Sequence, residues 1–340
     1  MARFHAIFRP ATPVPRNGVD VVRSATRSTD CVAFPNGSTV KRTIPSVPGF
    51  ALACVIGAGE LFAQDVQPRV YTPAPVGINL VTLGYSYSSG AVLYDKTIPI
   101  EDASARVHSL SAAYSRSIGL FGSAGRIDLA VPFVSGEWVG ELKQLASSAS
   151  RTGFGDPVLR VALFPVGAPA LSRQEFAGFK PRTTLGVTVR LHMPLGQYDP
   201  DKLINLGSNR WVLSPQVGVS HPAGRFLLEA YAGAWFFSDN DEFLGTKTFS
   251  QDPLYTIQVH VGYSFPKGIW IAVSSRQSLG GATRVDRGEK TDPESNNRLG
   301  LTFNVPLGKG FSLKLAATTG VTATVGNDYD TFVAALQKAW

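Results

Sequence analysis

The C-terminal segment places the strongest constraint on how this chain can fold. Residues 329–340 alternate in polarity and stop on an aromatic residue, Trp340. Bacterial outer-membrane barrels close their last strand in this way, and the terminal aromatic helps the barrel-assembly machinery to recognise the chain. We therefore expect the last strand to end at a membrane surface, with Trp340 as the assembly signal.

Similar alternating segments precede this ending. In one of them Tyr255, Ile257, Val259 and Val261 alternate with small, polar or charged residues. A span of about ten residues with one apolar face is typical of a strand that crosses a bilayer. The pattern predicts an all-β, up-and-down antiparallel transmembrane barrel of about 12 strands, within a range of about 10–14. The expected strands are residues 81–88, 107–116, 126–135, 157–164, 184–193, 211–220, 226–237, 255–265, 269–278, 299–305, 311–319 and 329–340.

The alternative architecture is a soluble antiparallel barrel or sandwich, because its strands alternate as well. The chain has no apolar run near the roughly 20 residues that a spanning helix requires, so a membrane-spanning form must use strands. The secretion signal, the aromatic strand ends and Trp340 favour the membrane barrel.

The lengths of the connections give the barrel a direction. Short connections are expected at residues 221–224, 266–268 and 306–310, and longer polar ones at residues 194–210, 238–252 and 280–297. Outer-membrane barrels have short periplasmic turns and long external loops. Trp340 is therefore expected at the periplasmic rim.

Residues 1–63 are expected to be a leader. The basic pair Lys41-Arg42 precedes an apolar stretch at residues 47–59, and Ala63 offers a small residue for cleavage, which are the three parts of a secretory signal. The leader is long, so we expect translation to begin near Val40. Lipidation at Cys54 is disfavoured because Ala51 replaces the branched apolar residue that this modification needs. The expected mature chain has a proline-rich segment at residues 64–77 and a barrel at residues 78–340.

The charge and cysteine content agree with secretion. The net charge is +7, and residues 1–63 hold seven basic and three acidic residues, or +4, which leaves +3 for the remainder. That remainder is too small and too scattered for a nucleic-acid surface. Both cysteines, Cys31 and Cys54, precede residue 64, which suits a chain that crosses an oxidising periplasm.

The polar face of the strands supplies the expected lumen lining. Charged residues facing lipid near mid-membrane cost roughly 2–4 kcal/mol, so they are placed inside. They form either a salt-bridged interior or a basic constriction that attracts anions. The expected lumen residues are Asp128, Arg160, Arg190, His192, Gln216, Gln258, His260, Arg276, Asn304 and Lys314, with Glu229 if its strand keeps register.

The proline-rich segment at residues 64–77 cannot join a central strand. It is either a small plug, with Arg69 and Tyr71 touching the barrel wall, or a periplasmic tail.

An enzyme is the less favoured class. Some outer-membrane barrels are hydrolases, which need a serine and a histidine oriented by a third group. No distinctive His-Ser cluster, phosphate loop, dinucleotide fingerprint or zinc motif is visible. We therefore expect no catalytic site, no cofactor and no metal.

Six further motifs lie at residues 67–79, 153–157, 194–199, 205–211, 237–240 and 278–281. They resemble motifs of the phenol-degradation meta-pathway family of outer-membrane transporters, and the resemblance extends over residues 64–340. The same motifs also have plain structural roles as strand entries and turns, with Trp211 at the membrane interface. Lys338 departs from the expected apolar alternation two residues before the end.

The resemblance implies a channel in the outer membrane of a Gram-negative cell. Its expected role is passive uptake of small hydrophobic or aromatic compounds. Its expected partners are outer-membrane lipid, the barrel-assembly machinery and these solutes. The alternatives are a non-conducting structural or adhesive barrel and, less favoured, an outer-membrane hydrolase.

Overall fold

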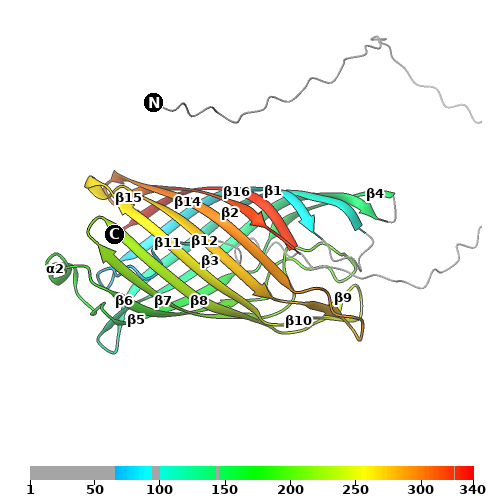
Figure 1. The fold of residues 1–340 in the computed structure, drawn as a ribbon, viewed down its shortest axis with the longest axis horizontal. Helices are drawn as coiled ribbons and strands as arrows, with labels where there is room; N and C mark the ends of the chain where they lie inside the picture. The colour runs from blue at the N-terminus through cyan, green and yellow to red at the C-terminus, as the bar shows by residue number, and fades with distance from the viewer. Residues whose placement is uncertain (1–65, 94–99, 143–144, 325) are drawn as a thin grey trace, which may run out of the picture. The chain divides into compact units, whose positions relative to one another are not determined.

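The computed structural model describes residues 66–93, 100–142, 145–324 and 326–340, so the predicted leader at residues 1–63 lies outside the described residues. The described part is built mainly of β-strands (Figure 1). The twelve strands of the wall are β1 (Asn79–Leu93), β2 (Ile100–Leu120), β3 (Ser123–Leu142), β5 (Val158–Val166), β6 (Thr184–His192), β7 (Val212–Ala223), β8 (Phe226–Phe237), β11 (Leu254–Ser264), β12 (Trp270–Gly280), β14 (Glu294–Gly308), β15 (Phe311–Thr322) and β16 (Gly326–Ala339).

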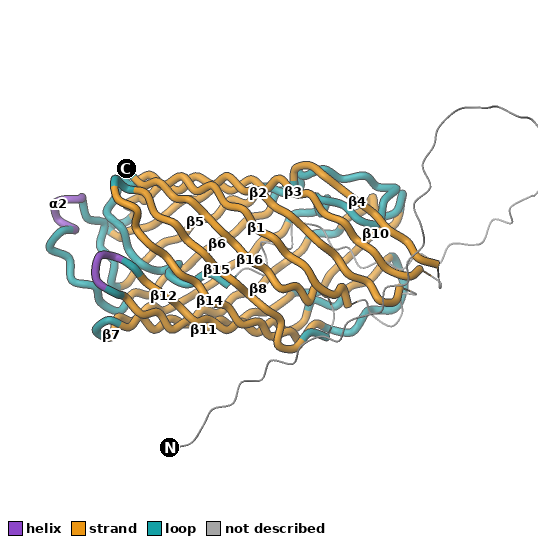
Figure 2. Tube along the Cα trace, turned by 90° about the horizontal axis from the view of Figure 1, so that it is seen from above, coloured by secondary structure: helices purple, strands orange, loops and turns teal. Residues whose placement is uncertain are grey.

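These strands form a closed ring. Each pairs with its neighbours along the chain in antiparallel fashion, and β16 pairs with β1 from Gly326–Leu93 to Ala339–Leu80. Closure removes the open sheet edge that lipid cannot satisfy. The strands are tilted around the barrel (Figure 2), as closure requires. The prediction of an antiparallel barrel of about twelve strands is confirmed.

One wall strand is interrupted. Residues 133–142 of β3 pair with β4 (Leu145–Phe154), and residues 125–130 of the same strand pair with β5. Residues 155–157 lie between β4 and β5, and Pro157 cannot donate a ladder hydrogen bond. The sequence predicted only the β5 part, because β4 is rich in serine and lacks an apolar face.

The two faces of the wall differ as the alternation predicts. On β11 the buried residues alternate with exposed ones, and Ile257 is 57% exposed whereas His260 is 1% exposed. Large apolar side chains such as Leu110 and Val273 also point outward. The outward face is therefore the lipid-facing one, and the inward face is mostly polar.

The two ends of the barrel are unlike each other. One end, the turn end, carries Trp340, the turns after β2, β7 and β14, and the short 3-10 helix η1 (Pro266–Gly268) (Figure 1). The other, the loop end, carries the long connections with β9 (Asn240–Phe243), β10 (Lys247–Gln251) and β13 (Thr283–Val285). The connection between β5 and β6 is an exception: it is long and holds α2 (Arg173–Phe176), yet lies at the turn end. In the described ranges, no helix is long and apolar enough to cross a membrane.

The observed strands are longer than predicted. Strand β2 has 21 residues and β3 has 20, whereas about ten cross a membrane. The extra length lies toward the loop end, where outward positions such as Arg106 and Glu137 are charged. Beyond the lipid the outward face becomes polar, so the outward apolar alternation used for prediction ends before the strand does. The inward face there is apolar, with Val107 and Trp138 buried in one cluster.

Candidate transport lumen

The predicted lumen residues all lie on the inward face of the wall. Arg190, for example, shares its face with Thr188, which is buried, and opposes Ser214 in the register. Glu229 is also inward and buried, so its strand keeps register. The inward set is Asp128, Arg160, Arg190, His192, Gln216, Glu229, Gln258, His260, Arg276, Asn304 and Lys314.

Asp128 is the centre of one charged cluster. Its carboxylate lies 2.7 Å from Nε of Arg160 on β5 and 2.9 Å from Nε of Arg126 on its own strand. Arg160 also donates from Nη1 to Oε1 of Gln67 at 2.9 Å. Two guanidinium groups share one carboxylate, so this part of the lumen carries an excess of positive charge.

Replacing Asp128 with asparagine should weaken the barrel and increase its preference for anions. The change removes charge-assisted hydrogen bonds worth about 1.5–3 kcal/mol and leaves Arg126 and Arg160 without their carboxylate. The lower stability should appear as a lower temperature of heat-induced mobility shift, and the added charge as a shifted reversal potential across a salt gradient. Unchanged values of both would show that the cluster contributes to neither.

Arginine side chains also line the other wall of the lumen. Arg276 on β12 opposes Gln258 and Arg298 in the register, and both arginines are buried. Glu294 interacts electrostatically with the two arginines. Lys314 opposes Asn304. Basic groups therefore occur on both sides of the lumen.

Tyr71 fills part of the lumen. It belongs to the plug segment, defined here as residues 66–77, and is 0% exposed. Its ring packs edge-on against Tyr231 at 4.9 Å between centroids, and Gln216 Nε2 donates to its hydroxyl at 3.0 Å. Gly186 and Gly218 are register partners on β6 and β7, and a Cβ at either would collide with the Tyr71 ring. The paired glycines form a notch for this ring.

Further bonds hold the plug segment. The backbone N–H of Arg69 donates to Glu229 Oε2 at 2.7 Å, and its Nη2 donates to Ser264 Oγ at 2.7 Å. The Arg69 guanidinium lies 4.5 Å from the centre of the Trp270 ring, a cation–π geometry. Arg69 and Tyr71, the two residues predicted for a plug, thus contact β7, β8, β11 and β12.

The long connection between β5 and β6 holds the plug segment where this segment leaves the lumen at the turn end. Leu171 accepts a hydrogen bond from the backbone of Val76 at 2.8 Å, and Ala168 accepts one from Ala124 at 2.8 Å. A capping box between Ser172 and Glu175 starts α2. Hydrogen bonds from Ser172 hold the pKa of Glu175 below its usual value. This mouth of the barrel is therefore lined by ordered backbone.

Three motifs quoted for the family resemblance, at residues 153–157, 194–199 and 205–211, meet at the loop end. Asp156 follows β4, is buried, and accepts hydrogen bonds from the backbone of Gly196 at 2.9 Å and from the hydroxyl of Ser208 at 2.6 Å. The connection between β6 and β7 is thereby tied to the break in the wall. Within it Lys202 lies 2.5 Å from Asp199 and holds the pKa of that carboxyl below its usual value.

Aromatic side chains pack around Arg210 beside this connection. The guanidinium lies 4.5 Å from the ring centre of Phe237 and 5.0 Å from that of Phe249. Phe249 also packs with Phe243 and Val285 in an apolar cluster. Packed loops therefore restrict the opening at the loop end.

One side of the lumen is less covered than the other. None of the twelve residues of β15 is buried. Its inward positions between Lys314 and the loop end are small: Ala316, Thr318 and Gly320. The plug segment packs mainly against the opposite strands, although its first residue, Val66, lies against Gly300 on β14.

The structure brings one histidine and one serine together. His260 Nδ1 lies 2.7 Å from Ser274 Oγ, but its Nε2 is buried without a hydrogen-bond partner. A hydrolase needs the histidine to be oriented by a third group, and His260 has no such contact among the described residues. His192 packs near Trp235 at 5.5 Å, away from His260. No cluster of three or more metal-binding side chains occurs in the part of the chain that the structure describes.

Several lumen residues escaped the sequence analysis. Arg126 is two residues from Asp128, so the same parity could have identified it. Arg298 lies between the expected loop at residues 280–297 and the expected strand at residues 299–305, so it was not assigned to either. Arg210 belongs to a loop, and no periodic signal could have placed it.

Comparisons with known proteins agree with this geometry. The family model described as "Putative MetA-pathway of phenol degradation" matches residues 95–335. No curated protein matches the sequence.

Among solved structures, the chain is similar to the COG4313 outer membrane channel from Pseudomonas putida F1. The TM-score is 0.67 at 21% sequence identity, over 81% of this chain and 100% of that one. It also matches the transport unit of the autotransporter AIDA-I from Escherichia coli with a TM-score of 0.46 at 9% identity, over 82% of this chain and 93% of that one. The first likeness shows a shared barrel fold.

Proposed function

The chain belongs to the family described as "Putative MetA-pathway of phenol degradation", and from this premise we propose that it is a passive channel for small hydrophobic or aromatic compounds. The protein lies in the outer membrane, since its barrel is closed and its outward face is apolar. Outer-membrane lipid and the barrel-assembly machinery are then its partners.

The observation that carries the proposal is the unequal filling of the lumen. The plug segment packs mainly against the strands from β6 to β12, with Val66 reaching Gly300 on β14, while none of the residues of β15 is buried. A barrel built only for structural support would be expected to pack its interior with side chains, as small barrels do.

The basic lumen supports a substrate class. Arginines on β5, β6, β12 and β14 attract anions, and their guanidinium planes stack on aromatic rings. Aromatic acids and phenolates combine both features. Passage of these solutes along β15 would bring them past Lys314 and Arg298.

Purified protein in planar bilayers should conduct ions, and liposomes that contain it should swell with small aromatic solutes. A deletion strain should take up such solutes more slowly than the parent. An absence of both conductance and swelling, together with unchanged uptake in the deletion strain, would remove this function. The non-conducting structural or adhesive barrel would then be the better assignment.

Replacing Arg190 or Arg276 with alanine should alter ion selectivity without reducing the yield of assembled barrel. Each change removes one positive charge from the lumen, so the anion-to-cation permeability ratio should fall. The reversal potential in a salt gradient measures the ratio, and heat-modifiable gel mobility measures the yield. An unchanged ratio would argue that these side chains are purely structural.

The non-enzymatic assignment has its own test. Ser274→Ala removes the one serine seen to bond a buried lumen histidine. We expect conductance and uptake to be unchanged, because neither requires a nucleophile. An ester-hydrolysing activity that is present in the parent protein and lost in this variant would overturn the assignment.

A further inference from the structure

The wall of the barrel is split between β15 and β16 near the loop end. The register between these strands ends at Thr318–Thr331, yet β15 continues to Thr322 and β16 begins at Gly326. On their other sides both strands stay paired, β15 with β14 as far as Thr322 and β16 with β1 as far as Gly326. We call the residues that lack register with each other, 319–322 and 326–330, the seam.

Polar groups occupy the inner side of the seam. The Arg298 guanidinium on β14 donates from Nη2 to the backbone carbonyl of Tyr329 on β16, and lies 3.5 Å from Thr318 Oγ1. It thus crosses β15 to reach a carbonyl that a continuous ladder would have used. Gly320 leaves room for the Asp328 carboxylate, because a Cβ there would collide with it. Side chains, instead of strand pairing, close the wall at this point.

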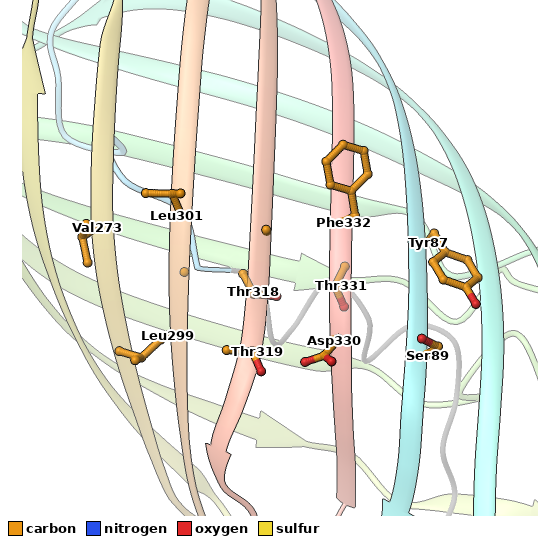
Figure 3. Close-up of a pocket in the computed structure, with 12 residues that line it drawn as sticks. Tyr87, Ser89, Val273, Leu299, Leu301, Thr318, Thr319, Asp330, Thr331 and Phe332 are labelled. Atoms are coloured by element: carbon orange, nitrogen blue, oxygen red, sulfur yellow. The ribbon is translucent and has the colours of Figure 1, made fainter. Parts of the chain in front are cut away.

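A groove of about 600 Å³ lies on the outward face at the edge of the seam, where Thr319 and Asp330 belong to its lining (Figure 3). Its sides are apolar and lipid-facing: Val273, Leu299 and Leu301 on one flank and Phe332 and Tyr87 on the other. Its volume is within the range of small-molecule sites.

The floor of the groove reaches toward the lumen. Ala317 and Thr319 face outward, but Gly300, Thr318 and Thr331, which have inward parity, also line the groove. The wall is thin here, because its inward positions are Gly300, Thr318 and Thr331. On the lumen side, Val66 of the plug segment lies against Gly300.

We propose that the seam is a lateral exit, through which a neutral aromatic solute passes from the lumen into the groove and then into the hydrocarbon layer of the membrane. The proposal rests on the proposed channel function and specifies the route. The free energy of an apolar solute falls when it moves from water into lipid. The plug segment obstructs the other way out, through the mouth at the turn end. The bond from Arg298 to Tyr329 closes the exit and can be exchanged for water when the strands part.

The route can be tested by filling the groove from outside. Ala317 is exposed on the outward face, so Ala317→Trp adds bulk to the groove and none to the lumen. Ala334→Trp is the matched control, since Ala334 faces outward on β16 and does not line the groove. Both variants are normalised to the amount of heat-modifiable barrel.

Toluene uptake is measured in the deletion strain carrying each variant, and chloride conductance in planar bilayers. We expect Ala317→Trp to lower channel-dependent toluene uptake severalfold while conductance stays at the parent value, and Ala334→Trp to change neither. Equal uptake by the two variants would overturn the lateral exit, as would a parallel loss of conductance in Ala317→Trp, which would indicate a blocked lumen. A parent protein that conducts chloride but does not accelerate toluene uptake would overturn the lateral exit while leaving the channel function intact, whereas a parent protein that does neither would remove both.

A second experiment locks the seam. With Thr319→Cys and Asp330→Cys, a short thiol-reactive cross-linker that is released by reductant bridges β15 and β16. No other cysteine follows residue 54, so labelling is confined to this pair in a chain cleaved after Ala63. Cross-linked protein should lose toluene uptake and regain it after reduction; uptake that persists in fully cross-linked protein would exclude the route.

Discussion

Gly186→Ala should open the barrel, and the same change should have little effect once Tyr71 is alanine. A Cβ at Gly186 would collide with the Tyr71 ring, which is fully buried and also confined by Gly218 on the neighbouring strand. Truncating a buried aromatic side chain typically costs about 3–5 kcal/mol. A loss of that size would shift the ratio of seated to displaced plug at least about a hundredfold. Single-channel conductance should therefore rise severalfold in Gly186→Ala and in Tyr71→Ala.

The double variant separates a plug effect from a wall effect. If the glycine matters only because it makes room for the ring, the conductance of Gly186→Ala with Tyr71→Ala should equal that of Tyr71→Ala alone. Gly262→Ala is the control, because Gly262 is a buried glycine of β11 and a Cβ there would meet its nearest atoms at an ordinary 3.6 Å. Conductance at the parent level in both single variants would mean that the ring does not obstruct the pore.

The fold was predictable wherever contact with lipid requires the outward face of a strand to be apolar. On β11 every second residue from Tyr255 to Val261 faces outward and is exposed, because a strand with lipid on one side must keep that side apolar. Beyond the membrane the outward face of a strand no longer needs to be apolar. Strand β4 pairs with residues 133–142 of β3, toward the loop end, and was therefore missed. Strands β9, β10 and β13, which lie in the loops, were missed as well.

The inward face was predictable by parity, but its pairing was not. Asp128 and Arg160 could each be placed inside from their own strands. Their ion pair depends on β3 and β5 being neighbours, and Arg160 bonds Gln67 only because the plug segment enters the lumen. These are tertiary facts with no local signature. The same limit applies to Tyr71, whose notch is made by two glycines more than a hundred residues away in the sequence.

At the seam both strands were predicted correctly from their own sequences, but the pairing between them stops early. Residues 311–319 and 329–340 were expected as the last two strands, and both are present. Their pairing nevertheless ends at Thr318–Thr331, and residues 319–322 continue β15 without register to β16. Gly320, Asp328 and Arg298 lie together at this gap, and only the three-dimensional arrangement relates them.

Trp340→Ala should lower the amount of assembled barrel severalfold while leaving export across the inner membrane intact. Trp340 lies at the turn end, where its backbone exchanges two hydrogen bonds of 3.1 Å with Asn79 and completes the closure of β16 on β1. Its side chain is 50% exposed, as expected for an aromatic at the membrane interface. Until the ring closes, the edges of β1 and β16 are unpaired, and lipid cannot satisfy them. Loss of the terminal aromatic should therefore act on assembly before it acts on transport.

Two further variants decide whether the terminal position matters or only the loss of an aromatic. Phe311→Ala removes a lipid-exposed aromatic from the same rim, next to Lys338, whose ammonium lies 4.3 Å from that ring. Trp340→Phe keeps an aromatic at the end of the chain. The yield of heat-modifiable barrel should fall in Trp340→Ala, fall less in Phe311→Ala, and remain near the parent value in Trp340→Phe. If Trp340→Ala and Phe311→Ala assemble equally well, the aromatic ending acts as an ordinary interface anchor, and recognition by the assembly machinery must depend on other features of the strand.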